Sequence, residues 1–142
     1  MAIIQTLTTS FKVEVAQALH NFTTGTGNVF KLALYTANAD LGASTTAYTA
    51  AGESSGTNYS AGGIVLTNIT PSFQGTTSYW SFQNATFTNV TLTTNGALIY
   101  NSTNGNRSVA VLNFGVNITK TAQDLVITFP VNDATNAVLR IA

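Results

Sequence analysis

The stretch Val29-Phe-Lys-Leu-Ala-Leu-Tyr-Thr36 decides the fold class of this chain. Its side chains alternate in the manner of a half-buried β-strand, and a Thr-rich turn with Gly25 and Gly27 precedes it. The apolar runs that follow are short and rich in β-branched and aromatic residues, which favour strands. From Val29 onward we therefore predict a β structure.

With Val29–Thr36, the chain offers eight candidate strands, the others being Ile64–Ile69, Ser78–Phe82, Ala85–Leu92, Ala97–Tyr100, Val109–Phe114, Leu125–Phe129 and Ala137–Ile141. Turn signals separate them, at Pro71, Gly75, Asn95-Gly96, Asn104-Gly105, Gly115 and Asn132-Asp133. No helical crossover pattern intervenes, so the pattern predicts a mainly β fold, an antiparallel β-sandwich or jelly roll, with one short N-terminal helix.

One of these runs predicts a local irregularity. In Ala85–Leu92, Phe87 lies at one parity of the strand, whereas Val90 and Leu92 lie at the other. Side chains of opposite parity point to opposite faces of a sheet, so a β-bulge near Thr88–Asn89 would bring all three to the same face.

The predicted helix covers residues 10–22, with Ser10 as its N-cap and apolar side chains at helical spacing. Residues 1–9 are predicted to form an N-terminal arm, and residues 10–142 a single β-sandwich domain. Residues 37–63 are small, polar and rich in glycine, which indicates a long surface segment that makes contacts, with disorder as the alternative.

Charge is scarce in this sequence: 142 residues include five Lys or Arg, five Asp or Glu, one His and no Cys. Acid–base, nucleophilic and metal chemistry need several such groups held close together, so the composition argues against an enzyme. A net charge of zero gives no attraction to nucleic acid or to an anionic membrane, and no run reaches the roughly 18 apolar residues of a membrane span. The N-terminus also lacks the pattern of a Sec-type signal.

The few titratable residues suggest no site. His20 is the only imidazole and is not part of a metal-binding or triad motif, so we interpret it as structural. A calcium site could draw on scattered carboxylates, but no calcium-loop motif is present at Asp40, Glu53, Asp124 or Asp133. We predict no catalytic, cofactor-binding or metal-binding residues.

Large apolar residues in exposed contexts point instead to contacts with partners. Such side chains occur near both termini, in the long segment 37–63 and in the aromatic cluster around Trp80, which could also belong to the core or stack on a sugar ring. The predicted interface residues are Ile3, Ile4, Leu7, Tyr48, Tyr59, Trp80, Leu139 and Ile141.

Three stretches carry a resemblance to a known family. The helix-forming run 10–22 leads into Val29–Thr36, which is similar to an "FKxALYT" strand, and Glu53-Ser-Ser-Gly-Thr-Asn-Tyr-Ser-Ala-Gly-Gly63 is similar to an "E-x-S-G-T-x-Y-x-A-G-G" loop. The third stretch comprises Gly96–Thr103, Val109–Gly115 and Asp124–Phe129. Together they resemble the small virion structural proteins of tailed bacteriophages.

The resemblance implies a non-enzymatic β-sandwich that acts as a capsid cement (decoration) protein and stabilises the head by binding neighbouring capsid subunits. Its expected partners are the major capsid protein and itself, as a homo-oligomer that is trimeric if it sits at local three-fold points. The expected location is the virion, at the capsid surface, after synthesis in the host bacterial cytoplasm. The alternatives are a tail or baseplate component, and a carbohydrate- or receptor-binding β-sandwich.

Overall fold

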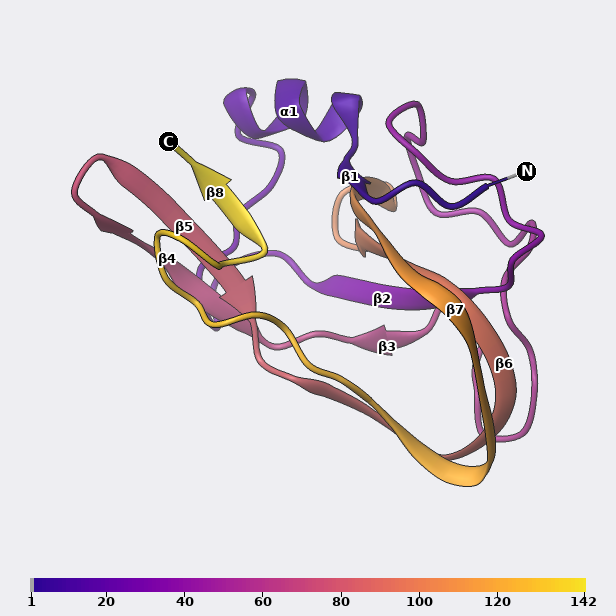
Figure 1. Cartoon of the computed structure of the whole chain (residues 1–142). Coiled ribbons are helices and arrows are strands. Elements are labelled where there is room, and N and C mark those ends of the chain that lie inside the picture. Colours follow the sequence, from indigo (N-terminus) through magenta and orange to yellow (C-terminus); the bar gives the residue numbers. More distant parts are fainter. Residues whose placement is uncertain (1) are drawn as a thin grey trace.

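Two antiparallel sheets and one short helix make up the fold in the computed structural model, which describes residues 2–142 (Figure 1). The elements are β1 (Thr6–Leu7), α1 (Thr9–Ala16), β2 (Phe30–Tyr35), β3 (Ile64–Val65), β4 (Asn68–Gln74), β5 (Thr77–Phe82), β6 (Ala85–Asn101), β7 (Arg107–Ile127) and β8 (Leu139–Ile141). One sheet has the order β1-β7-β6-β2-β3 and the other β4-β5-β8. The prediction of a mainly β fold with one short N-terminal helix is confirmed.

A long, bent hairpin of β6 and β7 connects the two parts of the molecule (Figure 1). At one end Ala85–Phe87 pairs with Leu125–Ile127, and at the other Gly96–Ile99 pairs with Ala110–Asn113. Between these ends the register shifts repeatedly, first between Phe87 and Val90, where Asn89 has a positive φ of 50°. The bulge predicted near Thr88–Asn89 is therefore present, and it bends the hairpin.

The hairpin also corrects the predicted strand boundaries. Asn95-Gly96 and Gly115 were expected to be turns between strands, but they lie inside β6 and β7, so four predicted strands form only two. Gly115 has a φ of +81°, a conformation that glycine tolerates within an irregular strand. Asn104-Gly105 does form the turn between β6 and β7, as predicted.

Strand β2 is buried on both of its faces, where alternation predicted burial of one face only. Phe30, Leu32 and Leu34 belong to the main core, which the small sheet and α1 help to cover. Ala33 and Tyr35 belong to a second cluster on the opposite face. The segment 37–63 covers that second cluster, with Leu41 and Tyr48 packed into it, so this segment is an ordered part of the domain.

The helix is shorter than predicted, and its N-cap lies two residues earlier. Thr8 is the N-cap in place of Ser10, since its hydroxyl accepts a hydrogen bond from the Phe11 amide, and the last helical residue is Ala16. Ala18 then takes a left-handed conformation with φ of 60°. The apolar side chain of Phe22, expected on the helix, instead reaches the main core from an extended segment.

Residues 2–9 are integrated into the domain instead of forming a detached arm. β1 pairs with β7 through Thr6 and Leu7, and the Ile4 amide donates to the Leu41 carbonyl at 2.9 Å. Ile3 is 7% exposed and packs into the second cluster. Met1 of the predicted arm lies outside the described residues.

The close approach of segment 37–63 to β2 depends on Gly63. A Cβ at Gly63 would lie 1.8 Å from the Leu32 carbonyl oxygen, and the residue has a φ of +81°. We expect Gly63→Ala to lower the free energy of unfolding by well over the roughly 1–2 kcal/mol of left-handed strain alone. Gly75→Ala is the matched control, because Gly75 also has a positive φ (+60°) but nothing within 4 Å of its Cβ position. Urea unfolding that gave equal losses for both variants would contradict this account.

Candidate functional site

The inner face of the small sheet presents apolar side chains toward helix α1. Trp80 of β5 and Leu139 of β8 are cross-strand partners, and Ile141 pairs with Ser78 two residues further along. Cross-strand partners share a face of the sheet, and so do residues two apart, so Trp80, Leu139 and Ile141 line the same face. Pairing of β5 with β8 thus creates one apolar wall.

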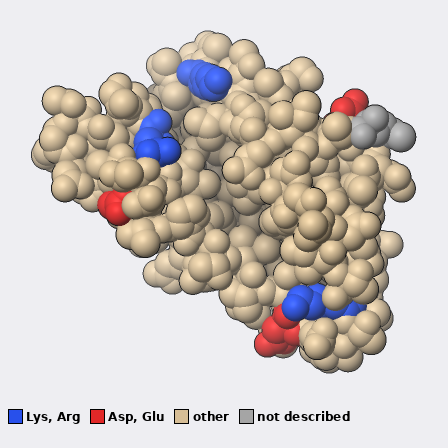
Figure 2. Space-filling view, in the orientation of Figure 1, with Lys and Arg blue, Asp and Glu red and all other residues tan. Residues whose placement is uncertain are grey.

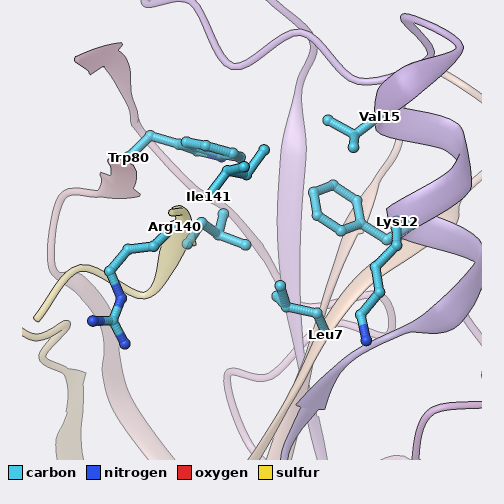
Figure 3. A pocket seen from close by; sticks show the side chains of 8 residues that line it. Leu7, Lys12, Val15, Trp80, Arg140 and Ile141 are labelled. Atoms are coloured by element: carbon cyan, nitrogen blue, oxygen red, sulfur yellow. The ribbon is translucent and has the colours of Figure 1, made fainter. Parts of the chain in front are cut away.

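Helix α1 and strand β1 supply the facing wall. The space between the walls is a groove of about 260 Å³, lined by Leu7, Phe11, Lys12, Val15, Trp80, Leu139, Arg140 and Ile141 (Figure 3). A cavity of about 150 Å³ lined by apolar side chains can hold a benzene ring. The groove therefore has room for at least one large apolar side chain of a partner.

Two further hollows lie beside this groove and are linked to it through shared lining residues. Leu7 and Arg140 also line a second hollow, together with Val138. Val138 also lines a third hollow, of about 340 Å³, beside β7. We call the three together the inter-sheet cleft. Figure 2 shows the surface hollowed between the two parts of the molecule, with no acidic or basic side chain on its visible floor.

The polar features of the cleft are few. Lys12 on α1 and Arg140 on β8 stand on opposite walls of the groove (Figure 3). Trp80 is 5% exposed, and its indole Nε1–H has no hydrogen-bond partner among residues 2–142. A buried indole N–H usually finds an acceptor, because leaving it without one costs about 1–3 kcal/mol. The cleft is thus apolar, with two basic side chains beside its groove and a buried indole N–H that has no partner.

The structure brings together half of the predicted interface residues. Leu7, Trp80, Leu139 and Ile141 all line the groove, although Leu139 is only 1% exposed and Trp80 contributes mainly to the core. Ile141 is 53% exposed, so it is the predicted interface residue of the groove that a partner can reach most readily. Ile4 is exposed outside the groove, at 61%.

The remaining predicted interface residues hold the domain together. Ile3 lies within the second core cluster, and Tyr48 packs against the same cluster. Tyr59 is half-buried, and its ring stacks on Phe87 at 5.7 Å between centroids. Their burial follows from segment 37–63 folding back over β2, which the spacing of residues along the chain does not reveal.

Glu53 is the centre of a hydrogen-bond network that holds segment 37–63 in place. Its Oε2 accepts a hydrogen bond from the Tyr48 hydroxyl at 2.5 Å, and its Oε1 accepts from the Tyr59 hydroxyl and the Gly62 amide, both at 2.7 Å. The Tyr59 hydroxyl also accepts from the Leu34 amide at 2.9 Å, which connects the network to β2. One carboxylate thus joins three parts of the covering segment to the sheet.

The electrostatics of this network keep its phenols protonated. Burial, followed by the hydrogen bond to Glu53, raises the pKa of Tyr48 to about 12. Burial likewise raises the pKa of Tyr59 and Tyr35 far above the usual value of 10.0. These hydroxyls therefore act as hydrogen-bond donors at neutral pH and not as bases.

His20 belongs to a second buried network, with Glu14, Arg107 and Asn101. Glu14 contacts His20 Nε2 at 3.1 Å and accepts from Arg107 Nη1 at 2.8 Å, while the Asn101 amide nitrogen lies 3.2 Å from His20 Nδ1. An amide nitrogen only donates, so Nδ1 is the acceptor and Nε2 carries the proton toward Glu14. Both ring nitrogens are occupied, which supports the structural interpretation of His20.

The carboxylates weighed for a calcium site lie apart. The Asp124 carboxylate accepts from the Asn89 amide at the bulge, and the Asp133 carboxylate accepts from the amides of Thr135 and Asn136 in its own turn. Within residues 2–142, no three His, Asp or Glu side chains come close enough to hold a metal ion. The described part of the chain also contains no helix that is long and apolar enough to cross a membrane.

The sequence did not single out the helix side of the groove. Phe11 and Val15 lie four residues apart and share one face of α1, so their helical spacing was a usable signal. Glu53 was considered as a calcium ligand and as the first residue of the loop that resembles a family motif, but not as the centre of a network. Glu53 is the only charged residue between positions 41 and 63, and this isolation was the signal in the sequence for a structural role.

Neither a protein-family model, nor a curated protein, nor a solved structure matches the chain.

The Glu53 network predicts a selective loss of stability. We expect Glu53→Gln to lower the free energy of unfolding by about 1–3 kcal/mol, because charge-assisted hydrogen bonds become neutral ones. The pKa of Tyr48, about 12 in the native chain, should fall toward 10.0 in an absorbance titration. Asp40→Asn, which changes an exposed acid in the same segment, should cost less than about 0.5 kcal/mol. Equal losses in the two variants would contradict the assigned role.

The His20 network predicts loss of stability in mild acid. Burial lowers the pKa of His20 below its usual 6.5, so the unfolded chain binds a proton more readily than the folded chain. The contribution of neutral His20 to the free energy of unfolding should be complete above pH 6.5, and it should decline as the pH falls toward the lowered pKa of the folded chain. The Asp133 carboxyl, whose pKa is lowered from 3.8 by hydrogen bonds, contributes only in a more acidic range. Urea unfolding should show a free energy of unfolding that falls from pH 7 to pH 5, and His20→Gln should remove this pH dependence. An unchanged pH dependence in the variant would refute the assigned role of His20.

Proposed function

We propose that this chain is a non-enzymatic structural protein of a bacteriophage virion that acts by docking, and specifically a capsid cement protein. The observation that carries the proposal is the inter-sheet cleft, in which apolar side chains of the domain's own core remain accessible. An accessible apolar groove is one of the surfaces on which proteins bind partners or ligands. The resemblance of the stretches 10–22, 29–36 and 53–63 to virion proteins indicates the assembly in which the docking takes place.

The chemistry of the surface supports a packing role. Ten charged side chains in 142 residues leave the surface to hydroxyls and amides, which form many weak contacts without strong desolvation costs. The two most buried acid-centred networks, around Glu14 and Glu53, are used to connect segments of the fold. A cement protein needs a stable body and a surface that binds neighbouring subunits, and the two networks and the inter-sheet cleft are the features that support this proposal.

A tail or baseplate component would use the same cleft and differs in copy number. The carbohydrate-binding alternative depends on an aromatic ring that is open for stacking. Of the residues considered for that role, Trp80 is 5% exposed, and Tyr48 and Tyr59 are half-buried and hydrogen-bonded to Glu53. We therefore retain docking onto a virion protein as the proposal.

The first test is the copy number of the chain in purified virions of the phage that encodes it. Mass spectrometry should give a ratio to the major capsid protein near one to one if the chain is cement. A ratio of a few per cent would move the proposal to the tail, and absence of the chain from virions would overturn it.

A second arm of this test uses heads that lack the chain. We expect native protein to bind them and Ile141→Asp to bind at least tenfold more weakly, because a charge in the apolar cleft must be desolvated. Val116→Asp is the matched control, since Val116 is an equally exposed β-strand residue (63%) that does not line the cleft. Equal binding of the two variants would exclude the cleft as the docking surface.

A further inference from the structure

Two strands at the edges of their sheets border the inter-sheet cleft: β8 pairs only with β5, whereas the chain around β1 also bonds to segment 37–63 through Ile4 and Thr9. β1 is the edge of the five-stranded sheet, and β8 is the edge of the three-stranded sheet. Leu7 of β1 lines the same hollow as Arg140 of β8, so the two edges face each other across it. An edge strand presents backbone N–H and C=O groups that can pair with a further strand.

The half-covered part of the main core lies in this cleft. Of the eight partly buried hydrophobic residues that pack against the core cluster in the described chain, six line the cleft: Leu7, Val15, Leu112, Phe114, Ile118 and Val138. Elsewhere the core is closed by a sheet, by α1 or by segment 37–63. The core therefore remains open between the two facing edges, where one more strand would close it.

The charge at the cleft restricts what can close it. Lys12 and Arg140 flank the groove, and Glu14, the acid nearest to Lys12 in sequence, is held by His20 and Arg107. The nearby Asp133 carboxylate is held by Asn136 and Thr135 within its own turn. Neither Lys12 nor Arg140 forms an ion pair among residues 2–142, although the Asp133 charge acts on Arg140, so a segment that enters the groove meets positive charge chiefly at Lys12.

We propose that the inter-sheet cleft receives an extended strand from a partner protein. The strand adds to the free edge of β8, places alternate apolar side chains in the cleft and carries a carboxylate at the end beside Lys12 and Arg140. This mode of binding combines main-chain hydrogen bonds for affinity with side-chain pockets for specificity. The inference rests on the docking function proposed above and names the partner's chemistry.

A second copy of this chain fits the cleft less well. In a symmetrical antiparallel pairing of two β8 strands, Arg140 would face Arg140 of the second copy, and like charges directly opposite are destabilising. The β4–β5 hairpin, residues 68–82, carries the exposed Phe73 but contains no Asp or Glu. Asp124 lies in β7, which is already paired along its length. A partner of different sequence is therefore favoured.

The test uses the purified full chain and two synthetic peptides. Each peptide alternates Val and Thr over six residues, and they differ only in a terminal Glu or a terminal Lys. Trp80 is the single Trp of the sequence and lines the groove, so its fluorescence reports occupancy directly. We expect saturable binding of the Glu peptide, about tenfold tighter than that of the Lys peptide at low salt.

Matched variants separate the charge from the strand pairing. Lys12→Glu combined with Arg140→Glu should reverse the preference to the Lys peptide, whereas Lys120→Glu, outside the cleft, should leave it unchanged. Because Arg140 also donates to the Thr135 carbonyl, Lys12→Glu alone provides a variant that leaves this contact intact and should reduce the preference. A Glu peptide whose backbone nitrogens are methylated along one edge should lose binding, since that edge can no longer donate hydrogen bonds to the carbonyl groups of β8.

The outcomes distinguish the proposals. Unchanged Trp80 fluorescence with both peptides would overturn the inference, and so would tight binding of the N-methylated peptide. A dimer in light scattering, with a concentration-dependent change in Trp80 fluorescence and no peptide binding, would overturn it in favour of a second copy. None of these results depends on virions, so absence of the chain from virions would refute the proposed location and leave strand binding standing.

Discussion

Burial of the β2–β6 pair on both faces is the constraint on which the rest of this structure depends. A strand pair buried on two sides needs a cover on each side, because a sheet face that is apolar must be removed from water. The small sheet and helix α1 help to cover one face, which carries Phe30, Leu32 and Leu34. The long segment 37–63 covers the other and has little regular structure of its own. Glu53 makes this cover stable, since one carboxylate collects donors from distant parts of the segment.

The bent β6–β7 hairpin connects the two parts of the molecule, whose sheets have unequal numbers of strands. Its two ends differ in their surroundings, and irregular pairing between Phe87 and Gly96 lets the hairpin change direction. Five strands cannot be fully covered by three strands and an eight-residue helix. The inter-sheet cleft is the physical result, so the proposed docking surface follows from the architecture and needs no dedicated loop.

The scarcity of charge links stability to function in this chain. Hydroxyl and amide groups supply most of its side-chain hydrogen bonds. Glu14 connects the helix to β7, far away in the sequence, and Glu53 connects parts of segment 37–63 to one another. Few charges therefore remain on the surface, and Lys12 and Arg140 stand out beside an apolar groove (Figure 3). Because the chain has so few charged residues, two basic side chains beside one groove are a stronger indication of the charge of a partner than they would be in a protein of ordinary charge content.

The sequence by itself determined the fold class, the bulge near Asn89 and the Asn104-Gly105 turn, because alternation, parity and turn chemistry are local properties. It also singled out Leu7, Trp80, Leu139 and Ile141 as interface residues, since large apolar side chains near chain ends are conspicuous, but it did not show that they meet. Only the tertiary structure decided that Gly96 and Gly115 lie inside strands, that the helix ends at Ala16 and that Ile3, Tyr48 and Tyr59 turn inward. The strand register and the burial of Ile3 depend on neighbours far away in the chain, and such long-range contacts leave no periodic signal in the residues themselves.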